Sequence, residues 1–185
     1  FFNIKCRKAG LKPAAAVVVV TVRALKMHGG VERSQLDSPN VEALQRGLEN
    51  LGRHLRNVGQ FGVPQLVAIN QFTADTPAEL DAIKAYAGQH GVGAYLCNHW
   101  AEGGKGATDL AAATIALADS DHAQFRPLYD DQMSLWEKAR TVARSIYGAD
   151  DIDADKKIRD QFERYQQAGY GHFPVCMAKT QYSFS

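Results

Sequence analysis

The chain has 185 residues, which is enough for one substantial domain or for two smaller pieces that share a core. Hydrophobic residues make up 45% of it and charged residues 22%, a globular composition that excludes wholesale disorder. The formal net charge is +1, so nothing global predicts nucleic acid, an anionic membrane or an acidic protein as a partner.

Cysteine and histidine spacing argues against a disulfide framework and against a metal centre. The cysteines are Cys6, Cys97 and Cys176, an odd number without a CxxC pair, which favours reduced thiols in a cytoplasmic protein. The six histidines form neither HxxxH nor HExxH, so no metal site is predicted. No stretch has the length and apolar character of a membrane span, and residues 1–5 lack signal-peptide features.

The first part of the chain alternates β-branched runs with a helical pattern. Residues 14–22 have the composition of a strand buried on both faces, and the basic segment 23–30 that follows ends in two glycines. From residue 40 to about 58, apolar residues recur at steps of three and four and predict a helix. Residues 64–70 are predicted to form a second buried strand.

The remaining elements continue this alternation. Thr76, Pro77 and Glu79 have the spacing of a capping box and predict a helix that runs to about residue 89. The other predictions are strands at 92–98, 125–129 and 173–178 and helices at 108–118, 132–147 and 154–168. Strands alternating with helices predict an α/β fold with a mostly parallel sheet built from βαβ units.

Two loops that follow predicted strands carry aromatic residues. Phe72 comes directly after the second strand and Trp100 directly after the third. Ligands of open parallel sheets bind at the carboxyl ends of the strands, so two such rings on neighbouring strands could hold a flat ring system between them. The alternative is that each ring closes the top of the core, since aromatic residues bury large areas wherever they lie.

Other motifs are weaker. Gly103, Gly104 and Lys105, with the glycine that follows, precede a helix and could receive an anion, although they lack P-loop spacing and suit a plain turn as well. Arg23 and Lys26 could face a phosphate or a carboxylate, or belong to a solvated basic segment. Cys176 is predicted to be a small buried apolar residue, and Lys179 is either a functional cation at the sheet edge or surface charge.

Several stretches resemble the formate–tetrahydrofolate ligase family, in the family's order and from end to end. ALKMHGG at 24–30 and PVCMAKTQYS at 174–183 are the longest specific matches. The full set is FFNIKCR (1–7), AGLKP (9–13), VTVRALKMHGG (20–30), ENL (49–51), VAINQFTADTPAEL (67–80), WAEGGKGATDLA (100–111), IYGAD (146–150) and FPVCMAKTQYS (173–183).

The resemblance implies a cytoplasmic ligase with a Rossmann-like or P-loop-NTPase-like architecture, incomplete here. ATP with Mg²⁺ would phosphorylate formate, and N10 of tetrahydrofolate would capture the formyl group. It also implies activation by a monovalent cation (K⁺ or NH₄⁺), and small-molecule partners only. It makes Phe72, Leu96 and Trp100 the expected folate-binding residues, while Thr73 departs from a proline common in the family.

The resemblance also implies that catalytic groups lie elsewhere. The P-loop lysine and the formyl-phosphate arginine of the family have no counterpart here, so the chain is expected to be an internal fragment that is inactive alone. Residues 1–60 would end the nucleotide-binding domain and residues 61–185 form a folate-binding lobe of a homo-oligomeric parent, a tetramer in bacteria. The alternative is a non-enzymatic folate-binding or protein-interaction module.

Overall fold

The computed structural model describes residues 1–178 and divides the chain into two compact units. The sheet unit comprises residues 13–124, and the helical unit combines residues 1–12 with the chain from residue 125 onward. The elements of the sheet unit are β1 (Ala16–Val20), α2 (Val22–His28), η2 (Arg33–Gln35), α3 (Val41–Gly59), β2 (Gln65–Asn70), α4 (Pro77–Gln89), β3 (Gly93–Cys97), α5 (His99–Glu102), η3 (Gly103–Ala107) and α6 (Thr108–Ala118). Those of the helical unit are η1 (Phe2–Cys6), α1 (Arg7–Ala9), α7 (Leu135–Val142), η4 (Ala143–Tyr147), α8 (Lys156–Gln167) and η5 (Tyr170–His172).

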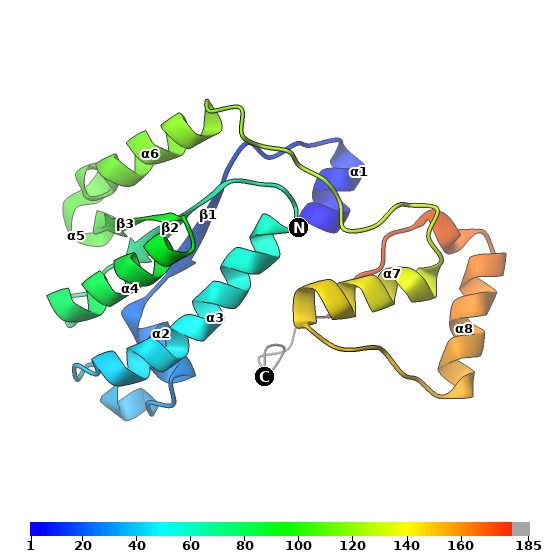
Figure 1. The fold of residues 1–185 in the computed structure, drawn as a ribbon, viewed down its shortest axis with the longest axis horizontal. Coiled ribbons are helices and arrows are strands. Elements are labelled where there is room, and N and C mark those ends of the chain that lie inside the picture. Colours follow the sequence, from blue (N-terminus) through cyan, green and yellow to red (C-terminus); the bar gives the residue numbers. More distant parts are fainter. Residues whose placement is uncertain (179–185) are drawn as a thin grey trace. The chain divides into compact units, whose positions relative to one another are not determined.

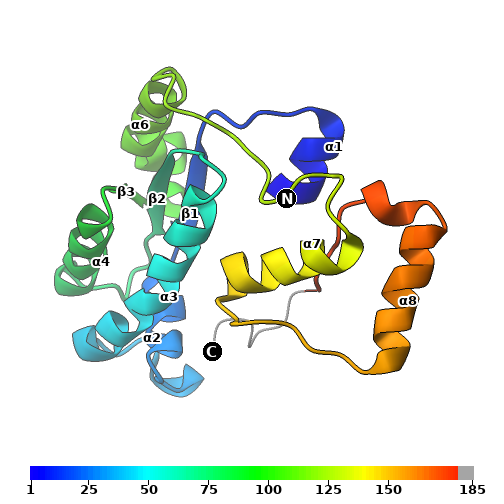
Figure 2. The same ribbon diagram turned by 45° about the vertical axis from the view of Figure 1, so that its right-hand side comes forward.

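The sheet is parallel, in the order β1-β2-β3, which confirms the α/β prediction and its βαβ construction. Helices α3 and α4 contact one face of the sheet, with α2 packed on α3, and α6 contacts the other face over β2 and β3 (Figures 1 and 2). The core between the sheet and its helices is made of aliphatic side chains, such as Leu44 and Leu48 from α3, Ile69 from β2 and Ile83 from α4.

The prediction that the first strand is buried on both faces is wrong for β1. Val18 packs against the core, but Val17 and Val19 are 39% and 67% exposed. Neighbouring side chains on a strand point to opposite faces, and α6 covers β2 and β3 but not this part of β1. The central strand β2 is buried on both faces, as predicted.

Three helices of the sheet unit, α2, α3 and α4, begin after a residue whose side chain caps them. The side chain of Asn40 accepts a hydrogen bond from the Ala43 amide at the start of α3. At the start of α4 the predicted capping box of Thr76 and Glu79 is present. The basic segment after β1 is the short helix α2, which Thr21 caps. α6 has the predicted bounds.

Two strand predictions in the helical unit are wrong. Residues 125–129 and 173–178 are irregular, because side chains rather than a neighbouring strand bond their backbone. Asn3 accepts from the Leu128 amide, Lys138 donates to the Phe173 carbonyl, and the Tyr129 hydroxyl accepts from the Val175 amide. Cys176 is exposed, contrary to prediction, since no sheet covers it. The two predicted helices are present with shorter α-helical bounds, as α7 with the π-turn η4, and as α8.

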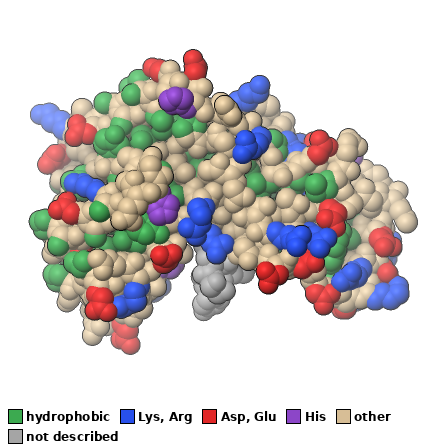
Figure 3. All heavy atoms as spheres, in the orientation of Figure 1, with side chains coloured by type: hydrophobic (Ala, Val, Ile, Leu, Met, Phe, Trp, Pro, Cys, Tyr) green, Lys and Arg blue, Asp and Glu red, His purple; other side chains and the backbone are tan. Residues whose placement is uncertain are grey.

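No helix among residues 1–178 is long and apolar enough to cross a membrane. Over the face drawn in Figure 3, Lys and Arg side chains are interspersed with Asp and Glu. Lys179, for which the sequence left open a functional cation or surface charge, lies outside the described residues.

Candidate functional site

The loops that carry Phe72 and Trp100 leave the same edge of the sheet. β2 and β3 are hydrogen-bonded neighbours that run parallel, and Asn70 lies opposite Cys97 at their carboxyl ends. The condition set by the sequence, that the two aromatic residues follow adjacent strands, is therefore met. We call the two loops, residues 71–76 and 98–106, the aromatic site.

Hydrogen bonds tie the two loops together. The Gln71 amide donates to the Cys97 carbonyl at 3.1 Å, one residue beyond the regular ladder. The indole Nε1 of Trp100 donates to the Gln71 carbonyl at 2.8 Å. The Trp100 side chain is thus fixed to the backbone residue that precedes Phe72, so the orientation of each ring depends on the other loop.

Both rings reach solvent. Phe72 is 40% exposed and Trp100 55%, so neither ring is fully buried. Exposed large aromatic side chains at the carboxyl edge of a parallel sheet are the pattern expected of a ligand site. Leu96 lies on β3 itself and is half-buried, with its side chain against the aliphatic core.

A short turn sets the backbone at Phe72. The Asp75 carboxylate accepts from the Phe72 amide at 2.8 Å, and the Asp75 amide donates to the Phe72 carbonyl at 3.0 Å. Burial raises the pKa of the Asp75 carboxyl, and the bond from the Phe72 amide opposes that rise. Residues 72–75 therefore form a turn that two hydrogen bonds between its first and last residues hold closed.

The segment that carries Trp100, predicted as a loop, consists of the short helices α5 and η3, and it closes on itself through a backbone contact. The Asn98 amide donates to the Gly106 carbonyl at 2.8 Å. A Cβ atom added to Gly106 would lie 2.5 Å from the Asn98 carbonyl carbon and oxygen, so only glycine permits this approach. Gly103, Gly104 and Lys105 are exposed along this loop, and an anion contact there stays a prediction.

The two basic residues of α2 differ in their surroundings. The Arg23 side chain is 45% exposed and pairs with Asp37 at 3.1 Å. Lys26 is 1% exposed, and its ammonium lies 3.0 Å from Glu79 Oε1 and donates to the Ser38 carbonyl at 3.0 Å. A phosphate could reach Arg23 from solvent, whereas it could reach Lys26 only if that residue left its buried pair.

Glu79 accepts hydrogen bonds on both carboxylate oxygens. Its partners are the Asn40 amide, the Thr76 amide and hydroxyl, and Lys26. Burial by itself would raise the pKa of Glu79, but these bonds outweigh it and lower the pKa to about 2. Sequence reasoning identified Glu79 only as a helix cap. Its ion pair with Lys26 joins positions that are distant in the sequence, so no local sequence pattern predicts it.

A thiol and an imidazole also meet at this edge. Cys97 Sγ lies 3.2 Å from His99 Nδ1, and the two residues end β3 and begin α5. Cys97 is buried and is not in a disulfide. Among residues 1–178, His, Cys, Asp and Glu side chains form no group of three that could hold a metal ion.

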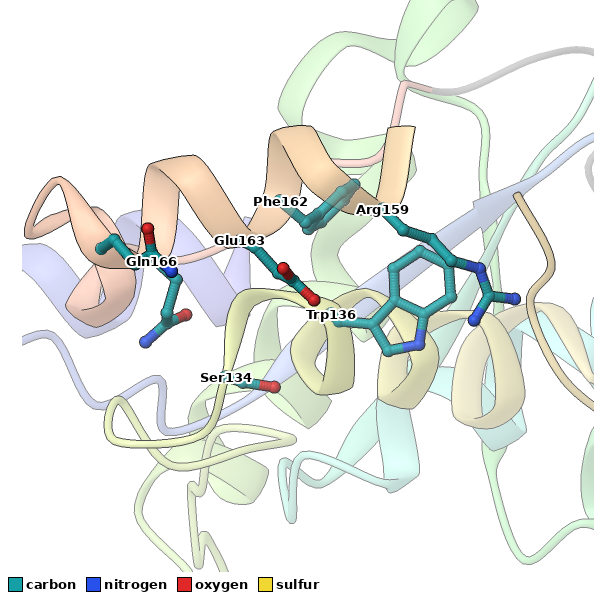
Figure 4. A pocket seen from close by; sticks show the side chains of 7 residues that line it. Ser134, Trp136, Arg159, Phe162, Glu163 and Gln166 are labelled. Carbon is teal, nitrogen blue, oxygen red and sulfur yellow. The ribbon is translucent and has the colours of Figure 1, made fainter. Parts of the chain in front are cut away.

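A separate cavity of about 340 Å³ lies in the helical unit, between α7 and α8 (Figure 4). Trp136 forms one wall of the cavity. The Phe162 ring packs edge-on against the Trp136 ring, with 5.5 Å between the two ring centres. The Arg159 guanidinium lies 4.9 Å from the centre of the Trp136 ring. Arg159 is also bonded to Asp153 and to the Ala154 carbonyl. The cation and the aromatic wall of this cavity are thus engaged with each other.

Comparison with known proteins assigns the family. The family model described as formate–tetrahydrofolate ligase matches residues 1–185, the whole chain. Two relatives that bear this name, from Sinorhizobium fredii and Cereibacter sphaeroides, are 58% and 60% identical over 185 residues. The matches cover 100% of this chain and 33% of each relative, so the chain spans a third of their length. With its whole length matched and more than half of its residues identical to those of these relatives, the chain belongs to the formate–tetrahydrofolate ligase family.

Proposed function

We propose that this chain supplies the folate-binding loops of an ATP-dependent ligase that joins formate to tetrahydrofolate. The products are 10-formyltetrahydrofolate, ADP and phosphate. ATP phosphorylates formate, and N10 of tetrahydrofolate then attacks the formyl carbon and displaces phosphate. Family membership supports the reaction, and the two exposed aromatic rings support the part that this chain plays in it.

The observation that carries the proposal is the exposure of Phe72 and Trp100 on loops tied to each other. A pterin or aminobenzoate ring is flat and aromatic, and it gains most by offset or edge contact with such side chains in place of water. Since Trp100 is held through its Nε1, its ring face is oriented before the ligand arrives, which lowers the entropic cost of binding. Leu96 adds apolar contact from β3.

In this proposal the phosphate chemistry depends mainly on residues other than those of this chain. No GxxxxGK[ST] sequence occurs in its 185 residues. Arg23 and the exposed loop of Gly103, Gly104 and Lys105 are the groups proposed to contact the phosphates of ATP, which Mg²⁺ accompanies. Family membership alone is the basis for three further parts of the proposal: activation by K⁺ or NH₄⁺, a cytoplasmic location and a homo-oligomeric parent protein.

Tryptophan fluorescence tests the folate site directly. The chain has two tryptophans, so Trp136→Phe leaves Trp100 as the only one. We expect tetrahydrofolate to quench the fluorescence of this variant. We also expect Phe72→Ala and Trp100→Ala each to weaken binding, measured by calorimetry, about tenfold, since each removes a stacking surface worth roughly 1.4 kcal/mol.

Ile115→Ala is the matched control, because Ile115 is 63% exposed on α6 of the same unit. It should leave the affinity unchanged. Equal affinity of the Phe72→Ala, Trp100→Ala and Ile115→Ala variants would show that the rings do not hold folate. The purified chain is also expected to show no formate-dependent ATP hydrolysis. Rapid hydrolysis would contradict the proposal that the phosphate chemistry depends mainly on residues other than those of this chain.

The same titration separates the alternative of a protein-interaction module. Such a module predicts no tetrahydrofolate-dependent quenching of Trp100.

A further inference from the structure

The ion pair of Lys26 and Glu79 is the most deeply buried charge pair in the described structure, with side chains 1% and 0% exposed. It joins α2 to the start of α4, two elements that are distant in sequence. Apolar residues of similar size in such a place are often equally stabilising, because the cost of desolvating two charges offsets their attraction. Stability alone therefore does not account for the pair, and its position in the fold is informative.

Glu79 holds the downstream end of the Phe72 loop. Its Oε2 accepts from the Thr76 amide at 3.0 Å and from the Thr76 hydroxyl at 2.8 Å. Thr76 directly follows the turn in which Asp75 and Phe72 bond each other. Gln71 holds the upstream end. Its amide donates to the Cys97 carbonyl, and its carbonyl accepts a hydrogen bond from the Trp100 indole. Phe72 thus lies between two fixed backbone points.

The Phe72 ring depends on this backbone for its position. It is 40% exposed, and it makes no ring–ring contact with any residue among positions 1–178. Side-chain packing therefore restrains the ring less than it would in a core. A shift of Thr76 would be transmitted through the closed turn of residues 72–75 to the ring.

Lys26 fixes the carboxylate that fixes Thr76. Its ammonium bridges Glu79 Oε1 and the Ser38 carbonyl, and the same Oε1 accepts from the Asn40 amide at 3.0 Å. The carboxylate is thereby clamped between α2 and the segment that leads into α3, leaving Oε2 to face Thr76. Without the pair, Glu79 could change rotamer and release the loop.

We propose that Lys26 and Glu79 are positioning residues for Phe72, a role that rests on the proposed folate site. They hold the backbone from which the Phe72 ring projects, through Thr76, and they do so without touching the ligand. Loss of the pair lowers folate affinity mainly through Phe72, because the Thr76 end of the loop that it frees is the end nearer to Asp75 and Phe72.

A double-mutant cycle measured by tetrahydrofolate calorimetry tests this role. Glu79→Gln keeps the size of the side chain and removes its charge. We expect it to weaken binding about three- to tenfold when Phe72 is present. In the Phe72→Ala background we expect less than a twofold change, because the ring through which Glu79 acts is gone. Thr76→Val, which deletes one hydroxyl bonded to Glu79, is a milder version for use if Glu79→Gln folds poorly.

Glu42→Gln is the matched control, since Glu42 pairs with Arg46 at 2.8 Å on the exposed face of α3. It should leave affinity unchanged in both backgrounds. Equal losses from Glu79→Gln with and without Phe72, or no loss at all, would overturn the positioning role. If Phe72→Ala and Trp100→Ala themselves leave affinity intact, the folate site fails instead, so the two failures are distinguishable.

Discussion

At the scale of single residues, the aromatic site depends on side chains that bond backbone groups. Trp100 donates to the Gln71 carbonyl, and Asp75 accepts from the Phe72 amide. Both bonds fix the Phe72 segment, residues 71–76, which has no strand or helix ladder of its own. The rings are consequently held in place while remaining exposed, a combination that free loops lack.

Gly106 gives a residue-scale prediction. Gly106→Ala would place a methyl group 2.5 Å from the Asn98 carbonyl, so the loop of residues 98–106 must move. We expect tetrahydrofolate binding to weaken by about tenfold or more, because Trp100 moves with this loop. Gly104→Ala is the control, since its Cβ would meet nothing within 4 Å. Similar affinities of the two variants would contradict the prediction.

At the scale of elements, the approach of α2 to α3 fixes where the basic residues lie. A Cβ atom on Gly47 of α3 would lie 1.9 Å from the Leu25 carbonyl oxygen of α2, so the two backbones are in direct contact. Lys26 follows Leu25 and is directed inward to Glu79. The close contact therefore determines that a lysine predicted to be solvated or ligand-facing is a buried partner in an ion pair.

Two glycines of α3 give an element-scale prediction with opposite signs. Gly47→Ala should lower the free energy of unfolding by about 1–3 kcal/mol, since the added methyl forces α2 and α3 apart. Gly59→Ala, at the exposed end of the same helix, should raise it by roughly 0.5–1 kcal/mol, since alanine is the better helix former. Urea unfolding measures both. A stabilising Gly47→Ala would refute the close contact.

At the scale of the whole molecule, the pH dependence of stability depends on buried charge. The pKa of Glu79 is about 2 in the folded chain, against an ordinary value of 4.5. A lowered carboxyl pKa contributes stability that is complete above the unfolded value and is lost as the pH falls toward the folded one. Glu79 therefore stabilises the fold at neutral pH and progressively less below about pH 4.5.

Urea unfolding at pH 6 and pH 3 tests this contribution. The free energy of unfolding of the wild type should fall more over this interval than that of Glu79→Gln, by about 2 kcal/mol, from 1.36 kcal/mol per pKa unit. Glu42→Gln should retain the wild-type dependence, because its exposed pair contributes little. Parallel pH profiles for wild type and Glu79→Gln would show that Glu79 is not the titrating group.

Local patterns predicted much of the sheet unit. The capping box at Thr76 and Glu79, the apolar period of α3 and the β-branched run of β2 each arise from neighbouring residues, and each is present in the structure. The strand predicted at 125–129 failed for the opposite reason. Its composition suits a strand, but Asn3 and Arg7, distant in sequence, bond its backbone instead.

The sequence by itself determined the parallel α/β fold, the family and the two loops that carry Phe72 and Trp100, because periodicity, caps and motifs are local properties of the chain. Only the tertiary structure decided that both rings are exposed, that Trp100 bonds Gln71, and that Lys26 is buried against Glu79. The physical reason is that burial and ion pairing depend on which distant segments pack together, and no local pattern records that packing.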